Sequence, residues 1–277
     1  MHVGFLVSRR WVLFAIAVGM LAFLAFRLGE WQFHRLEDRE DRNRITERNL
    51  AAAAMPIGQV LKPGQAVTAE QEWQPVTATG TYAEDESVIV RYQTRDGKSG
   101  VDVVTPLVTG SGIALLVNRG WLATDNVGTT RPEVPSAPAG KVTVVGWVRA
   151  DATGDSAQVA DRSTRAISST EIAPTLSVPA YRGFVELRKE TPSPQQPLTT
   201  AQAPDLSEGP HFFYGLQWWF FAVLALSGFG YLAWDERRKA QSARVIPPST
   251  GTMAPDTNDA AGDSRNAAVR PNSSGRP

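Results

Sequence analysis

Two apolar stretches limit what this 277-residue chain can fold into. The first covers residues 11–28, and the second covers residues 212–234 and contains no Asp, Glu, Lys or Arg. A helix rises about 1.5 Å per residue, so about 20 residues suffice to cross a hydrocarbon core of about 30 Å. The sequence therefore predicts transmembrane helices at 11–28 and 211–234, with a polar domain at 29–210 between them.

Positive residues beside these stretches predict the orientation of the chain. An arginine pair at 9–10 precedes the first stretch, and a basic cluster at 237–239 follows the second. Segments rich in Lys and Arg remain on the cytoplasmic side of a membrane. Both termini, including residues 1–10, are therefore expected to be cytoplasmic, and residues 29–210 extracytoplasmic.

The first stretch is interpreted as a retained anchor rather than a cleaved signal peptide. It is longer than a usual signal-peptide core, and its small-residue triplet Ala15-Ile-Ala17 lies inside the apolar run instead of after it. No Arg-rich and Ser-rich transit segment precedes it. We therefore expect a multi-pass protein of a bacterial plasma membrane, with lipid around both helices.

Composition narrows the function further. The chain has 28 basic and 28 acidic residues, whereas nucleic-acid binding calls for a concentrated basic surface, so no nucleic-acid partner is expected. Cysteine is absent and only three histidines are present, which argues against a zinc site made of protein ligands alone. No nucleophile, base or phosphate-binding loop stands in a recognisable pattern, so we do not expect an enzyme.

The extracytoplasmic region is expected to join a helical stalk to a β-rich domain. Residues 29–54 are rich in helix-forming Glu, Arg, Leu and Ala, and Pro56 with Gly58 is expected to end the stalk. The β-rich part covers residues 72–190, and short apolar segments predict its strands at 75–82, 87–92, 100–108, 112–119, 141–148 and 181–187.

These strands and their connections predict the fold class. A Thr-Gly-Ser turn at 109–111 indicates a hairpin, and Ser168 or Ser169 is expected to cap a short helix that Pro174 limits. We predict an α+β membrane protein in which two transmembrane helices flank a mainly antiparallel, barrel-like β domain with short helices. Residues 235–277 are polar and lack periodicity, which predicts a disordered cytoplasmic tail.

Aromatic and charged residues near the strand and helix ends are the first candidates for a site. Trp31, His34 and Arg35 follow the first apolar stretch, where such residues commonly anchor a helix at the lipid headgroups. Arg119 and Trp121 lie at the end of a predicted strand, where they either belong to a turn or face the membrane or a partner.

His211 is the strongest single candidate, because it opens the second apolar stretch after Gly209-Pro210. A helix N-terminus favours the neutral imidazole, which is the form that binds iron. Gly215, Trp218 and Ala222 continue the same helix face. The small residues would let a flat macrocycle approach this face, or they would pack against the first helix instead.

Five motifs occur in a fixed order along the chain. They are Gly29, Trp31, Gln32 and Arg35; the segment 100–107; Asn118–Trp121; Gly146, Val148 and Arg149; and His211, Tyr214, Gln217, Trp218, Phe221 and Ala222. This order resembles the Surfeit locus protein one family, which assists the assembly of cytochrome c oxidase. The resemblance covers about residues 11–238, with Gly215 in place of the family's alanine and only a loose match over 151–198.

The resemblance implies a membrane chaperone that binds haem a and helps to insert it into the catalytic subunit of a haem-copper cytochrome c oxidase. That subunit is the expected partner, with haem A synthase as a further candidate. The implied ligand of the haem iron is His211. The other residues that we expect to contact or close the haem site are Tyr214, Gln217, Trp218, Trp31, His34, Arg35, Arg119 and Trp121. Arg35 and Arg119 would meet propionates, and His34 would be a second axial ligand.

Three alternatives remain open from the sequence. An assembly scaffold would stabilise the catalytic subunit without binding haem. An extracytoplasmic sensor or transport accessory would use the β domain for another ligand. A haem-modifying enzyme is the weakest alternative, since no catalytic set is visible.

Overall fold

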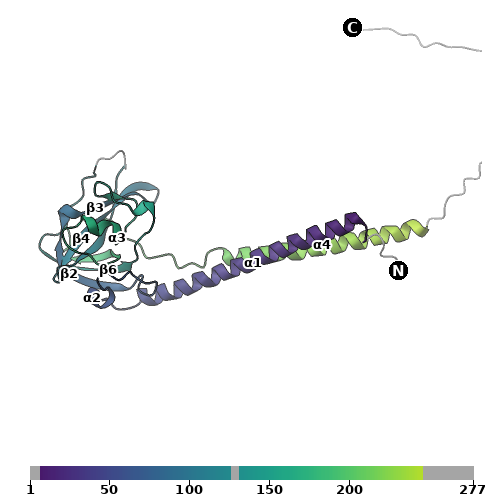
Figure 1. Ribbon diagram of the computed structural model, residues 1–277, viewed down its shortest axis with the longest axis horizontal. Helices are drawn as coiled ribbons and strands as arrows, with labels where there is room; N and C mark the ends of the chain where they lie inside the picture. The colour runs from purple at the N-terminus through teal and green to yellow at the C-terminus, as the bar shows by residue number, and fades with distance from the viewer. Residues whose placement is uncertain (1–6, 126–130, 246–277) are drawn as a thin grey trace, which may run out of the picture. The chain divides into compact units, whose positions relative to one another are not determined.

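A computed structural model describes residues 7–125 and 131–245 (Figure 1). The described chain divides into two units, one formed by Leu21–Val223 and the other by the described residues on either side of that range. The larger unit contains the β domain and the adjoining segments of both long helices.

Two long helices and eight strands account for most of the described chain. The helices are α1 (Arg9–Leu50) and α4 (His211–Val245), and the strands are β1 (Met55–Pro56), β2 (Pro75–Tyr82), β3 (Val88–Arg95), β4 (Lys98–Thr109), β5 (Ala114–Ala123), β6 (Lys141–Arg149), β7 (Ser163–Thr164) and β8 (Phe184–Thr191). The short elements are α2 (Ile57–Val60), α3 (Ser169–Ile172), η1 (Glu84–Glu86), η2 (Asp155–Ala157) and η3 (Ala173–Thr175).

Both long helices have an apolar segment long enough to cross a membrane. These segments are only 22% and 11% buried, which is too little for core helices of a soluble domain. In the smaller unit, Trp11 and Phe14 of α1 both contact the ring of Phe229 of α4, at centroid distances of 5.8 and 5.5 Å.

Helix α1 runs without interruption through the predicted stalk but ends at Leu50, four residues before the expected end. The reason is a tertiary contact. Asn49, only 6% exposed, donates from its amide to the carbonyl oxygens of Glu70 and Glu72, both at 2.8 Å. The last helical turn is therefore fixed by the β domain, and Pro56 already lies in β1.

Helix α4 starts at His211 as predicted but continues to Val245. Residues 235–245, expected in the disordered tail, are therefore helical. Lys239 contacts Asp235 one turn earlier at 2.8 Å, and the Arg238 guanidinium lies over the Trp234 ring. Such pairs support an exposed helix. The remaining tail residues, 246–277, lie outside the described residues.

Five strands close into a barrel, which confirms the predicted barrel-like fold. Strands β2, β6, β8, β5 and β4 pair in that order, and pairing between β4 and β2 completes the ring. All five pairs are antiparallel except β5 with β8, which are parallel at Val117↔Val185 and Asn118↔Glu186. Figure 1 shows these strands gathered in one domain.

The barrel interior holds the main apolar core. Inward-facing residues from β2, β4, β5, β6 and β8 pack together and are nearly inaccessible; they include Val76, Leu107, Leu115, Val117, Val142, Val144, Val148 and Val185. Burial in β2 and β6 alternates along the strand, as the sequence pattern requires for strands with one face in a core.

Two local expectations needed correction. The last strand was expected at 181–187 but runs over Phe184–Thr191, because Gly183 has φ +85° and breaks the extended chain. Helix α3 forms where expected, but Ser168 makes no side-chain cap. Instead Asp151 accepts hydrogen bonds from both the backbone N and the hydroxyl of Ser169, each at 2.6 Å.

Candidate functional site

Close packing of α1 against α4 defines the surroundings of His211. Phe33 of α1 lies directly beside Gly215, where a Cβ would meet the Phe33 ring at 2.8 Å. Gly29 of α1 likewise receives the indole of Trp219, whose ring is 4.8 Å from that of Phe33. Each helix thus offers one glycine that receives an aromatic ring of the other helix: Gly215 receives Phe33, and Gly29 receives Trp219.

His211 points from the start of α4 toward α1 and contacts Gln32. Its Nδ1 lies 2.9 Å from Gln32 Oε1. A glutamine oxygen can only accept, so Nδ1 carries the hydrogen in this arrangement. The described residues provide no hydrogen bond to Nε2, which leaves that nitrogen available to a ligand.

The chain before α4 is held against α1 by two side chains. Arg39 donates from Nε to the carbonyl oxygen of Ser207 at 2.6 Å, and Asn43 donates to that of Leu206 at 2.8 Å. Asp205 in turn accepts from the backbone N of Ser207 at 2.9 Å. These contacts fix the position along α1 at which α4 begins, and hence the position of His211.

The expected cradle for a macrocycle is occupied. Gly215 and Ala222 are buried, the former against Phe33 and the latter in a cluster with Ala22, Ala25 and Trp218. The structure therefore agrees with the alternative in which these small residues pack against the first helix. His211 itself fits an axial iron ligand, because metal-binding histidines usually have the second ring nitrogen hydrogen-bonded.

Among the described residues, the candidates on α1 make no hydrogen bond or ring contact with His211, although Arg35, three residues after Gln32, lies on the Gln32 side of the helix. Side chains two residues apart on a helix are rotated by about 200°, so His34 lies opposite Gln32 and away from α4. Trp31 is 50% exposed, and the Arg35 guanidinium lies over its ring at 5.6 Å. These three residues do not close a site around His211 here, and their haem contacts stay a prediction.

The candidates on α4 are divided between two faces. Tyr214 and Trp218 lie three and seven residues after His211, on the same side of the helix. Gln217 instead lines an apolar groove of about 600 Å³ along α4, together with Phe213, Leu216, Trp219, Phe220 and Val223. The structure therefore does not bring Gln217 to His211.

Arg119 and Trp121 are structural residues of the barrel. Arg119 is 2% exposed and donates to the carbonyl oxygens of Pro135 and Ser136, both at 3.1 Å. The indole N–H of Trp121 donates to the Gln93 carbonyl oxygen at 3.1 Å, and Trp121 is 8% exposed. Their predicted role in lining a haem site gains no support from these contacts.

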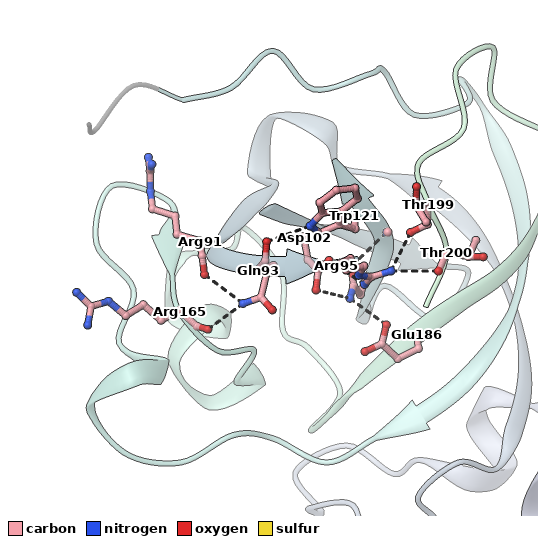
Figure 2. A network of polar contacts seen from close by, with 11 residues as sticks. Arg91, Gln93, Arg95, Asp102, Trp121, Arg165, Glu186, Thr199 and Thr200 are labelled. Carbon is pink, nitrogen blue, oxygen red and sulfur yellow. Dashed lines mark hydrogen bonds and ion pairs between the residues drawn. The ribbon is translucent and has the colours of Figure 1, made fainter. Parts of the chain in front are cut away.

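A second polar cluster lies where β4, β5 and β8 meet (Figure 2). Asn118 donates from its amide to Glu186 Oε2 at 2.9 Å and to Asp102 Oδ2 at 3.4 Å. Its own oxygen accepts from the backbone N of Gly120 at 3.2 Å. One asparagine therefore connects two buried carboxyl groups to the register shift in β5 at Arg119; the turn that was one of the sequence alternatives here is a continuous strand.

Burial changes the acidity of both carboxyl groups. Burial, reinforced by the nearby Asp102, raises the pKa of Glu186 from 4.5 to about 7. Burial also raises the pKa of Asp102, although Arg95 partly offsets this through an ion pair at 3.0 Å. Glu186 is therefore the group of this cluster whose protonation changes near neutral pH.

Arg95 links this cluster to the segment that leads to α4. Besides Asp102, its guanidinium donates to the carbonyl oxygens of Thr199 and Thr200 at 3.3 and 3.1 Å, as Figure 2 shows. Trp121 and Thr199 also exchange backbone hydrogen bonds at 2.8 and 3.0 Å. The segment from Thr199 to His211 is thus anchored at one end by Arg95 of β3 and by β5, and at the other end by α1.

Sequence reasoning missed Gln32 and Glu186 as residues of these two clusters. Gln32 and Phe33 stand three and four residues after Gly29, and this spacing could have placed them on the packing face with Gly29. Glu186 lay in a predicted strand with no distinguishing signal. The described residues contain no group of three or more His, Asp or Glu that could hold a metal ion.

The fold and this site define a small β-barrel protein whose two flanking helices are long enough to cross a membrane. A sequence profile of the SURF1 family matches residues 19–223, which include most of α1, the whole barrel and the start of α4. The chain therefore belongs to the SURF1 family.

Individual relatives agree with this assignment. An uncharacterised SURF1-like protein of Mycobacterium tuberculosis is 28% identical over 255 residues, which cover 89% of this chain and 93% of the relative. A SURF1-like protein of Monosiga brevicollis is 30% identical over 40% of this chain and 44% of its own length. The cytochrome oxidase assembly protein SHY1 of Saccharomyces cerevisiae is 25% identical over 39% of this chain and 27% of its own length.

Proposed function

We propose that this protein is a membrane chaperone for cytochrome c oxidase assembly that binds haem a and assists its insertion into the catalytic subunit. Membership of the SURF1 family and similarity to a yeast cytochrome oxidase assembly protein support the assembly role. The observation that carries the haem part is the contact between His211 and Gln32, which leaves Nε2 available to iron.

Each part of the site has a distinct task in this proposal. His211 coordinates the iron, and Tyr214, 48% exposed on the same side of α4, contacts the macrocycle. The bound haem supplies the prosthetic group that the oxidase needs. The β domain anchors the segment before α4 through Arg95 of β3, and so holds His211 at its position beside α1.

The two apolar helices anchor the protein in the membrane, with both termini on the cytoplasmic side and the barrel outside. His211 then lies at the outer end of α4, where the apolar segment begins. Haem delivered from this level of the membrane suits a partner that is itself embedded in the bilayer. The oxidase catalytic subunit is that partner. Haem A synthase is a second partner from which the haem would be received.

One observation favours a second candidate function, an assembly scaffold that binds no haem. Phe33 fills the space beside Gly215, so the closed helix pair offers no flat surface at that point. In the scaffold function the same interlocked helices present a fixed outer surface to the catalytic subunit. The two functions differ in what they require of His211.

Complementation of a deletion strain tests the proposal and separates the two functions. The strain receives the wild-type or the His211→Ala gene, and reduced-minus-oxidised spectra measure haem a in the oxidase while immunoblots measure the catalytic subunit and the variant. We expect His211→Ala to leave the subunit present but poor in haem a. Normal haem content with His211→Ala would favour the scaffold, and normal spectra in the deletion strain itself would reject both functions.

A further inference from the structure

We propose that Gln32 is the positioning residue for His211: it fixes the imidazole tautomer and ring orientation and thereby strengthens the bond from Nε2 to iron. This inference rests on the proposed function, but its first part concerns the haem-free protein. Gln32 is separated from His211 by 179 positions, so only the packing of α1 against α4 brings the two together.

The chemistry follows from the atoms in contact. Gln32 Oε1 is an acceptor, and at 2.9 Å it requires a hydrogen on Nδ1 of His211. A neutral imidazole carries a single N–H, so Nε2 then carries the lone pair that a metal needs. Hydrogen bonding of the N–H nitrogen also makes the other nitrogen a stronger ligand.

The contact is held from both sides along the helices. On one side, Phe33 fills the space at Gly215 and Trp219 fills that at Gly29. On the other, Arg39 lies 3.5 Å from where a Cβ on Gly209 would be, and it donates to the carbonyl oxygen of Ser207. A shift of α4 along α1 would break these contacts together. The position of His211 opposite Gln32 is therefore set by packing rather than by two free side chains.

The hydrogen bond from His211 Nδ1 to Gln32 fixes the tautomer whether or not haem is bound, whereas a purely structural link between two helices would leave haem affinity and midpoint potential unchanged. The tautomer is the first readout. Full-length protein is labelled with ¹⁵N-histidine, kept free of haem in lipid nanodiscs, and studied by NMR, where protonated and unprotonated ring nitrogens have well-separated shifts. The chain has three histidines, and the His211 signals are identified as those missing from the His211→Ala spectrum.

We expect the hydrogen of His211 on Nδ1 in the wild type and in Gln32→Glu, which keeps an acceptor. Gln32→Met keeps the length but removes the acceptor, and should give a mixture of tautomers. Gln59→Met, at an exposed position of α2, is the matched control. A hydrogen on Nε2 in the wild type, or an unchanged tautomer in Gln32→Met, would overturn the inference.

Spectral titration with haem a tests the second part. Gln32→Met should bind about 10–100-fold more weakly than the wild type and raise the midpoint potential of the bound haem, since a less basic imidazole stabilises ferric iron less. Gln32→Glu should restore affinity. If wild type and Gln32→Met bind alike while His211→Ala does not bind, the positioning role is rejected and haem binding stands. If the wild type binds no haem, the proposed haem function and the iron-related part of this inference both fall.

Discussion

Replacing Glu186 with glutamine will make the unfolding free energy of the protein less dependent on pH. In the folded chain Glu186 is buried beside Asp102 and its pKa is raised from 4.5 to about 7. In the unfolded chain the carboxyl group is hydrated and ionises near its ordinary value. Between these two pH values the unfolded state releases a proton that the folded state keeps, so stability falls as the pH rises.

The size of the effect follows from the two pKa values. Each pKa unit corresponds to about 1.4 kcal/mol, so the rise from 4.5 to about 7 corresponds to a loss of about 3 kcal/mol. The loss is absent below pH 4.5, grows up to about pH 7, and is constant above it. Glutamine does not ionise, and its oxygen can still accept from Asn118.

The assay is denaturant unfolding of the full-length protein in detergent micelles between pH 4.5 and 8.5, followed by tryptophan fluorescence. We expect Glu186→Gln to gain about 3 kcal/mol relative to the wild type over this range. Asp102 is present in both proteins, so its own titration largely cancels. Glu171→Gln, at an exposed site in α3, is the matched control and should follow the wild type. A constant difference between Glu186→Gln and wild type across the range would refute the reasoning.

Three further substitutions test the packing of the barrel by thermal or denaturant unfolding. Gly100→Ala should destabilise by about 1–3 kcal/mol, because its Cβ would collide with the Trp121 indole; stability within 0.5 kcal/mol of the wild type would contradict this. Tyr82→Phe should cost about 1–3 kcal/mol, because the Tyr82 hydroxyl donates to the buried Glu190 carboxylate at 2.8 Å; a neutral result would mean that water replaces the donor. Arg119→Lys should also cost about 1–3 kcal/mol, since lysine cannot hold two carbonyl oxygens in the same fork; unchanged stability would return Arg119 to the candidates for ligand binding.

The strand pattern of the barrel could be predicted from sequence wherever one face alone is buried. Strand β2 has the predicted bounds, Pro75–Tyr82, because apolar and polar residues alternate along it. Strand β8 was displaced because its start depends on Gly183, whose positive φ has no signature in the neighbouring residues. The parallel pairing of β5 with β8 was not predictable either, since it joins segments far apart in the chain.

The candidate site was predicted in part, for a similar reason. The position of His211 at the start of a helix follows from Gly209-Pro210 and the apolar run. Which residues surround it depends on how α1 rotates about its axis, and that rotation is set by Gly29 and Gly215 receiving aromatic rings. Trp31 and His34 are the residue types that predict a site, but the contact with His211 is made by Gln32.

Haem binding through His211 is the central claim, and an absorption spectrum of the purified protein tests it most directly. The wild type, His211→Ala and His34→Ala are each produced together with haem a synthesis and purified without added haem. We predict a Soret and an α band in the wild type and their loss in His211→Ala. Both bands should persist in His34→Ala, because His34 lies away from α4. Loss in both variants would make His34 a second ligand. A wild type free of haem, despite a confirmed supply of haem a, would contradict the account and leave His211 as a residue of the helix interface.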